Sequence, residues 1–269
     1  MGTVNGGARS SAGARAPGVA FLLCVVLAAT GCVTRDSPGY VKSDAAAKQR
    51  DTTRYAPSRD EGLGASVAIL VDNSGSMLEH AARDQAAKYR VARDAIEAML
   101  ATTDSFVARQ PGFPVNVGLY VFASSVSRLV PIRPYDREIL RSALEGMRPP
   151  RGGTAIGTAM ETAVSDLYHA GTIRKYILVV TDGENTEGRG PHAVAKEIAR
   201  RSGGAVRLYF VAFDVDAKRF SFLRDVNGEV LGARDGVALR ASLDTIYRGR
   251  ILAEAVGAGE TMPSTKKSP

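Results

Sequence analysis

Apolar residues fall along the chain in two alternating patterns. Short, nearly unbroken apolar runs, such as 66–71, are typical of parallel strands buried on both faces. Segments such as 81–100, where apolar residues recur every three or four positions, are typical of helices packed on a sheet. The patterns predict strands at 66–71, 115–123, 126–132, 176–180, 206–213 and 229–233, and helices at 81–100, 136–147, 154–167, 191–201 and 239–255.

This alternation predicts one α/β domain with a mostly parallel central sheet. The segment 126–132 follows its predecessor after only a Ser-Ser turn, so we expect it to run antiparallel. Pro131 and Pro134 favour a place for it at the sheet edge, where a missing backbone N–H is tolerated.

The amino end has the pattern of a secretory signal. An apolar run at 19–29 follows Arg9 and Arg15, and it is shorter than the roughly 20 residues that a membrane-spanning helix needs. It leads into Ala-Thr-Gly-Cys at 29–32, which resembles a bacterial lipoprotein cleavage box with Cys32 as the lipidated residue. Cys24 would leave with the signal, so Cys32 would have no disulfide partner. An ordinary signal peptide or an uncleaved anchor are the alternatives.

The chain therefore divides into four predicted parts. We expect a lipoprotein signal peptide at 1–31, a flexible tether at 32–64, one domain at 65–255 and a disordered tail at 256–269. This arrangement predicts a lipid-anchored, extracytoplasmic protein of the bacterial cell envelope, periplasmic or at the outer membrane if the cell has two membranes.

Charge and glycine-rich segments exclude two classes of ligand. The formal net charge is +7, but much of the surplus lies in the signal, tether and tail, and basic and aromatic residues are not interleaved. Nucleic-acid binders carry a concentrated basic face, so we expect no nucleic acid. The glycine-rich segment 152–157 lacks the lysine of a phosphate-binding loop, so we expect no nucleotide.

Oxygen-bearing side chains follow two predicted strands and open one predicted helix. Asp72, Ser74 and Ser76 come directly after the first strand, Thr154 follows Gly-Gly, and Asp182 follows the strand at 176–180. The carboxyl ends of neighbouring parallel strands open onto one crevice, so we expect the two aspartates to converge there. Hydroxyl and carboxylate oxygens are ligands that Mg²⁺ accepts. The sequence thus predicts a divalent-cation site.

These five residues, in this order, resemble the metal-ion-dependent adhesion site of von Willebrand factor type A (VWA) domains. The resemblance covers about 65–255. It implies a dinucleotide-binding-like fold with about six strands, one antiparallel edge and helices on both faces. It also implies bound Mg²⁺ or Mn²⁺ and capture of an Asp or Glu of a partner protein, and it does not imply catalysis.

The hydroxyls and the carboxylates could have different roles: Ser74, Ser76 and Thr154 would bind the ion, while Asp72 and Asp182 would hold its waters. The ion would then carry no negative protein ligand and would attract a partner's carboxylate. The positive end of a helix beginning near Met77 would repel the ion, which is a further reason for two aspartates nearby. We expect Asn73, Glu184 and Asn185 to form a partner-contacting rim, and the charges of the first helix, Lys88 among them, to be a solvated face.

Three other functions compete with metal-dependent protein binding. An envelope assembly or scaffolding accessory protein would use the metal structurally or as a regulator. A serine hydrolase could use Ser74, Asp182 and His192, but the glycines of a nucleophile elbow are replaced. A phosphatase could use Asp214-Val215-Asp216, but the Thr or Val expected two positions later is missing, since Ala217-Lys218 follows. The sequence therefore favours a membrane-tethered binding module that is not an enzyme.

Overall fold

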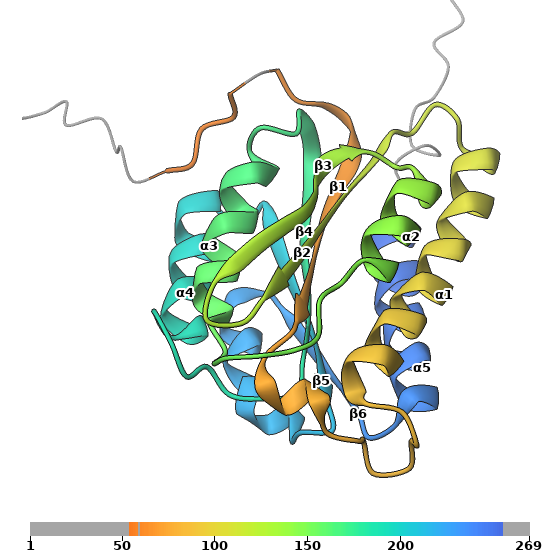
Figure 1. Cartoon of the computed structure of the whole chain (residues 1–269). Helices are drawn as coiled ribbons and strands as arrows, with labels where there is room; N and C mark the ends of the chain where they lie inside the picture. Colours follow the sequence, from red (N-terminus) through yellow and green to blue (C-terminus); the bar gives the residue numbers. More distant parts are fainter. Residues whose placement is uncertain (1–53, 59, 255–269) are drawn as a thin grey trace, which may run out of the picture. The chain divides into compact units, whose positions relative to one another are not determined.

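The computed structural model describes residues 54–58 and 60–254 (Figure 1). The predicted signal peptide, Cys32 and the tail at 256–269 lie outside these residues. The strands are β1 (Gly62–Asp72), β2 (Val115–Phe122), β3 (Val126–Pro134), β4 (Thr172–Thr181), β5 (Val206–Phe213) and β6 (Glu229–Ala233). The α-helices are α1 (Lys88–Arg109), α2 (Arg137–Glu145), α3 (Ile156–Leu167), α4 (Pro191–Ser202) and α5 (Gly236–Ile246), and the shorter helical segments are η2 (Gly75–Leu78), η3 (Ala217–Val226) and η4 (Tyr247–Leu252).

The six strands form one sheet in the order β3-β2-β1-β4-β5-β6. Neighbouring strands are parallel except for β3, which is antiparallel to β2 at one edge. The predicted fold class is therefore confirmed, including its single antiparallel edge. Because β1 and β4 are parallel neighbours, the residues that follow them lie at the same edge of the sheet.

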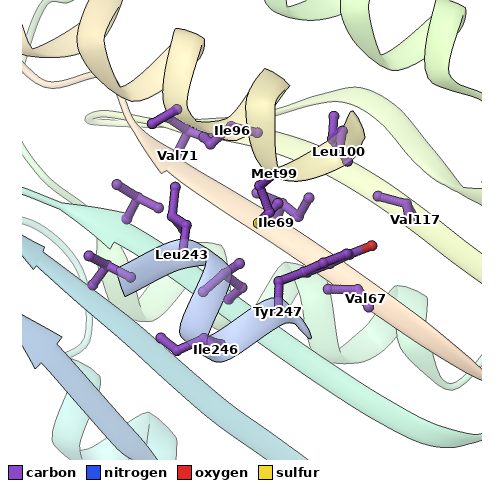
Figure 2. Packing of buried hydrophobic residues seen from close by; sticks show 14 of the residues in the cluster. Val67, Ile69, Val71, Ile96, Met99, Leu100, Val117, Leu243, Ile246 and Tyr247 are labelled. Atoms are coloured by element: carbon purple, nitrogen blue, oxygen red, sulfur yellow. The ribbon is translucent and has the colours of Figure 1, made fainter. Parts of the chain in front are cut away.

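Side chains of the central strand enter two separate hydrophobic cores. Val67, Ile69 and Val71 belong to the core on one side of the sheet, while Ala68 and Leu70 belong to the other. This follows from the two-residue period of a strand, and it explains why β1 reads as a continuous apolar run. Figure 2 shows the first core, where β1 packs against α1, α5 and the start of η4 through Ile96, Met99, Leu100, Leu243, Ile246 and Tyr247.

The first helix begins later and ends later than its pattern predicts. Residues 79–87 form a loop in which His80 and Ala87 make an isolated β-bridge, and the Lys88 N–H donates to the carbonyl of Glu79. The helix continues to Arg109 because Thr103 and Phe106 extend its buried face. The expectation of a helix starting near Met77 is wrong. A 3-10 turn of four residues occupies that place, so no long helix directs its positive end at the site from there.

The sequence also missed η3, which lies between β5 and β6. Its buried residues Phe220, Leu223 and Val226 cover the second core. A 3-10 helix repeats about every 3.0 residues and not every 3.6, and this segment is short and kinked at Phe220, so the α-helical spacing pattern did not reveal it. At the C-terminal side, α5 starts at Gly236 because Asp235 accepts a hydrogen bond from the Ala238 N–H as its N-cap.

Part of the predicted tether packs on the domain. The Tyr55 ring stacks on Tyr168 with 4.8 Å between centroids, and the Arg201 guanidinium lies 4.0 Å from the Tyr55 centroid. The Tyr55 N–H also donates to the Arg201 carbonyl at 3.0 Å, and β1 already begins at Gly62. Residues 54–58 are thus held against α3 and α4, a correction to the free tether expected there. No helix in the described part of the chain is long and apolar enough to cross a membrane.

Candidate metal site

Three loops meet at the edge of the sheet where β1 and β4 end. The first follows β1 and contains Ser74 and Ser76, the second contains Thr154 and leads into α3, and the third follows β4 from Asp182. The Gly75 N–H donates to the Gly152 carbonyl at 3.0 Å, and the Thr154 carbonyl accepts the N–H groups of Thr186 and Glu187. Backbone hydrogen bonds therefore join all three loops, as the position of the two strands predicts.

The polar side chains of these loops contact one another directly. Ser74 Oγ lies 3.2 Å from Ser76 Oγ, and Ser76 Oγ donates to Asp182 Oδ1 at 2.8 Å. Asp72 is held by two donors, the Ser74 N–H at 2.9 Å and the Thr181 hydroxyl at 2.6 Å. Asp72, Ser74, Thr154 and Asp182 are all buried. Side-chain oxygens of the loops after β1 and β4 thus contact one another, and buried Thr154 lies in the third loop, which backbone hydrogen bonds join to them.

The oxygen spacing fits an octahedral divalent ion. Ligands at about 2.1 Å around Mg²⁺ place adjacent oxygens about 3 Å apart, which is close to the 3.2 Å between Ser74 Oγ and Ser76 Oγ. Among the described residues, no group of three or more His, Cys, Asp or Glu could hold a metal. A cation at this site would therefore rely on hydroxyl groups together with the two carboxylates.

Burial changes the acidity of Asp72. Its removal from water raises the pKa of this carboxyl to about 6, although hydrogen bonds from Thr181 and Ser74 act in the opposite direction. An ionised carboxylate in this place is costly without a cation nearby, because the charge is buried. The site therefore holds a negative charge that a bound cation would stabilise.

The raised pKa predicts a pH dependence of stability in the metal-free protein. Between about pH 4 and pH 6, the folded state keeps a proton on Asp72 that the unfolded state has lost, so this group's contribution to stability falls as pH rises through that window. The loss totals about 3 kcal/mol and is complete above the folded pKa. We expect urea unfolding in EDTA to show this change as the difference between wild type and Asp72→Asn. A pH-independent difference would contradict the assignment.

Lys88 lies beside the candidate site, and the sequence analysis missed it. It is not on a solvated face, since its side chain is 6% exposed and its ammonium lies 3.1 Å from Asp182 Oδ2. The same ammonium lies 3.2 Å from Asp214 Oδ2 and 3.4 Å from Glu79 Oε2. Burial alone would lower the pKa of Lys88, but hydrogen bonds and charges from Asp182 and Asp214 raise it. It follows that a fixed positive charge adjoins the site.

The expected rim residues differ in their exposure. Asn73 is 8% exposed and donates to the Arg148 carbonyl at 3.1 Å, so it lies below the surface and supports the loop. Asn185 is half-buried; its side-chain oxygen accepts the Gly157 N–H of α3, and its amide donates to the Glu187 carbonyl in its own loop. Glu184 is exposed and forms an ion pair with Arg219. Glu184 is thus the best placed of the three to meet a partner.

The structure does not assemble a hydrolase triad. Ser74 Oγ contacts Ser76, while the hydroxyl that bonds Asp182 is that of Ser76. The His192 ring lies against Phe222, with 5.2 Å between centroids, in a 690 Å³ hollow beside η3. Nothing among the described contacts couples His192 to either serine as a base.

Gly157 fixes the distance between α3 and the loop after β4. A methyl group at this position would lie 2.0 Å from the Arg189 carbonyl oxygen, so the loop backbone would have to move. We expect Gly157→Ala to lower the free energy of unfolding by about 2 kcal/mol through this overpacking and to weaken cation binding. Chemical denaturation and calorimetry would measure the two effects.

Gly190, at the end of the loop between β4 and α4, supplies the matched control. A methyl group there meets no atom within 4 Å, so Gly190→Ala should leave both quantities nearly unchanged. Equal stability of the two variants would contradict the proposed close packing.

Comparisons with known proteins agree with this geometry. A family profile described as the von Willebrand factor type A domain matches residues 67–184, which include all five site residues. The fold is that of a VWA domain. No curated protein sequence matches the chain.

Solved structures share this VWA fold at low sequence identity. BatB from Bacteroides thetaiotaomicron is 23% identical with a TM-score of 0.56, and an aerotolerance-related membrane protein from Bacteroides fragilis is 21% identical with a TM-score of 0.54. Each comparison covers 71% of this chain and 100% of the other. Proximal thread matrix protein 1 from the mussel byssus is 15% identical with a TM-score of 0.54, over 73% of this chain and 47% of that one. That structure is described with a zinc-occupied MIDAS (metal-ion-dependent adhesion site) motif.

Proposed function

We propose that this protein is an extracytoplasmic binding module of the bacterial envelope that captures an Asp or Glu side chain of a partner protein through bound Mg²⁺ or Mn²⁺. Ser74, Ser76 and Thr154 would hold the ion. Asp72 and Asp182 would orient its waters and neutralise part of its charge. The observation that carries the proposal is the meeting of three loops at one sheet edge, where they bring together three hydroxyl-bearing residues and two buried carboxylates.

The chemistry of the site supports capture rather than catalysis. Each aspartate already accepts hydrogen bonds from neighbours that fix it, Asp72 from Thr181 and Asp182 from Ser76 and Lys88. Such carboxylates are suited to holding an ion and its waters in place. An ion bound mainly by neutral hydroxyls remains attractive to an incoming carboxylate. The zinc described at the corresponding motif of the mussel protein supports occupation of such a site by a divalent metal.

Attachment to the envelope rests on the amino end. Lipidation of Cys32 would anchor the chain, and residues 33–53 would link that anchor to the segment packed through Tyr55. The resemblance of the fold to an aerotolerance-related membrane protein is consistent with a place at a membrane.

A pair of short peptides tests the proposed capture. We would follow the amide NMR signals of the loops at 72–76 and 182–186 during titration with an Asp-containing pentapeptide. We expect Mg²⁺-dependent shifts that EDTA abolishes, and none with the peptide in which Asn replaces Asp. Binding that persists in EDTA would contradict capture through the ion and would favour the accessory-protein alternative, in which the partner contacts another surface.

A further inference from the structure

The Lys88 ammonium and the proposed cation share one carboxylate. Asp182 Oδ1 accepts the Ser76 hydroxyl at 2.8 Å, and Asp182 Oδ2 accepts the Lys88 ammonium at 3.1 Å. Both the Asp182 side chain and Lys88 are buried, with 0% and 6% of their side chains exposed. Since Ser76 would bind the ion directly, a divalent ion and an ammonium would lie on the two sides of the same carboxyl group.

Two positive charges so arranged repel each other with little screening. Water and salt reduce interactions between buried charges far less than those between exposed ones. Asp214 offsets part of the lysine charge at 3.2 Å, but its side chain is 25% exposed. Glu79 at 3.4 Å is 71% exposed, so it contributes little. Among the residues that the structure describes, Asp182 is therefore the fully buried carboxylate whose charge Lys88 neutralises.

We propose that Lys88 is a built-in counter-ion that keeps the empty site folded and lowers its affinity for divalent cations. This inference rests on the proposed function of the site. When the site is empty, the ammonium neutralises Asp182, which would otherwise be a buried carboxylate without a positive partner. When a divalent ion binds, the same ammonium opposes it and leaves excess positive charge, which favours addition of a partner's carboxylate.

A coupling between the two ligands follows from this arrangement. Lys88 neutralises part of the Asp182 charge that would otherwise stabilise the ion. The carboxylate of a partner would replace that negative charge, so cation and partner should each strengthen the binding of the other. Lys88 is thus a positioning residue, because it acts through Asp182 and Asp214 and not by touching the ion.

Lys175 provides a matched control for removal of a buried lysine. It is 2% exposed, is paired with Glu61 and donates to the Thr172 carbonyl at 2.7 Å. It lies near the start of β4, whereas Asp182 directly follows the end of that strand. Lys175→Met should therefore lower stability without changing the charge at the site.

The experiment compares wild type, Lys88→Met, Lys88→Gln and Lys175→Met as whole proteins, with Mg²⁺ and Mn²⁺ affinities measured by calorimetry. We expect both Lys88 variants to bind the ions about tenfold more tightly than wild type, and Lys175→Met to bind as wild type does. Lys88→Gln keeps a donor for Asp182, so it serves if Lys88→Met does not fold.

Thermal unfolding gives a second readout. In EDTA, Lys88→Met and Lys175→Met should both have a lower Tm than wild type. Mg²⁺ should raise the Tm of all three proteins, and it should narrow the deficit of Lys88→Met relative to wild type while leaving that of Lys175→Met unchanged. If wild type binds the ions and both Lys88 variants bind them equally or more weakly, only the proposed role of Lys88 is overturned. Absence of ion binding in every folded variant would overturn the proposed function as well.

Discussion

Asp72→Asn is expected to weaken Mg²⁺ binding by about a hundredfold while leaving the protein folded. The Asn side chain keeps an acceptor for the Ser74 N–H and a polar group beside the Thr181 hydroxyl, which Asp72 now bonds at 2.9 and 2.6 Å. It removes the negative charge that, with Asp182, offsets the ion. Calorimetry with the whole protein at pH 7.5 would measure the loss, well above the pKa of about 6 that burial gives Asp72.

The stability of Asp72→Asn separates a functional role from a structural one. Because burial disfavours the ionised carboxylate, its neutral replacement should be at least as stable as wild type in EDTA. Asp166→Asn is the control, since Asp166 on α3 pairs with Arg128 on β3, and it should bind Mg²⁺ as wild type does. Unchanged Mg²⁺ affinity in Asp72→Asn would contradict the site, and its global unfolding would make Asp72 a structural residue.

Ile69→Ala is expected to lower the free energy of unfolding by about 4 kcal/mol. Ile69 is fully buried at the centre of β1 and lies between α1 and α5 in the core of Figure 2. The rigid sheet cannot collapse around the missing atoms, so a cavity adds to the lost apolar burial. Urea unfolding monitored by circular dichroism would measure the change.

Ile173→Ala makes the same chemical change at an exposed strand position. Ile173 is 54% exposed in β4, so we expect its replacement to cost less than about 1 kcal/mol. Similar costs at Ile69 and Ile173 would mean that β1 is not the centre of the sheet.

The fold could be predicted largely because both cores leave a clear pattern. A strand buried on both faces reads as an apolar run, and β1, β4 and β5 each do so. The start of α1 could not be predicted, because a loop at 79–87 that carries Ala81, Ala82 and Ala87 has the composition of a helix. Its conformation depends on contacts distant in the sequence, such as the Gly236 N–H donating to Asp84.

The positions of the five proposed site residues could be predicted for a different reason. Each lies at the end of a strand, just after one or just before a helix, so the topology of a parallel sheet indicates the edge at which it lies. Lys88 could not be found in this way. It stands among charged residues with the spacing of an exposed helix face. It is buried beside Asp182 and Asp214 because the ends of β4 and β5 and the loop at 79–87 pack together around it.

Crystals of the protein saturated with Mn²⁺ test the central claim most directly, through anomalous diffraction at the manganese edge. We predict one strong peak about 2.2 Å from the hydroxyl oxygens of Ser74, Ser76 and Thr154, with Asp72 and Asp182 reaching it through waters. The absence of a peak between these three residues in saturated crystals would contradict the account, and so would a peak held by other side chains.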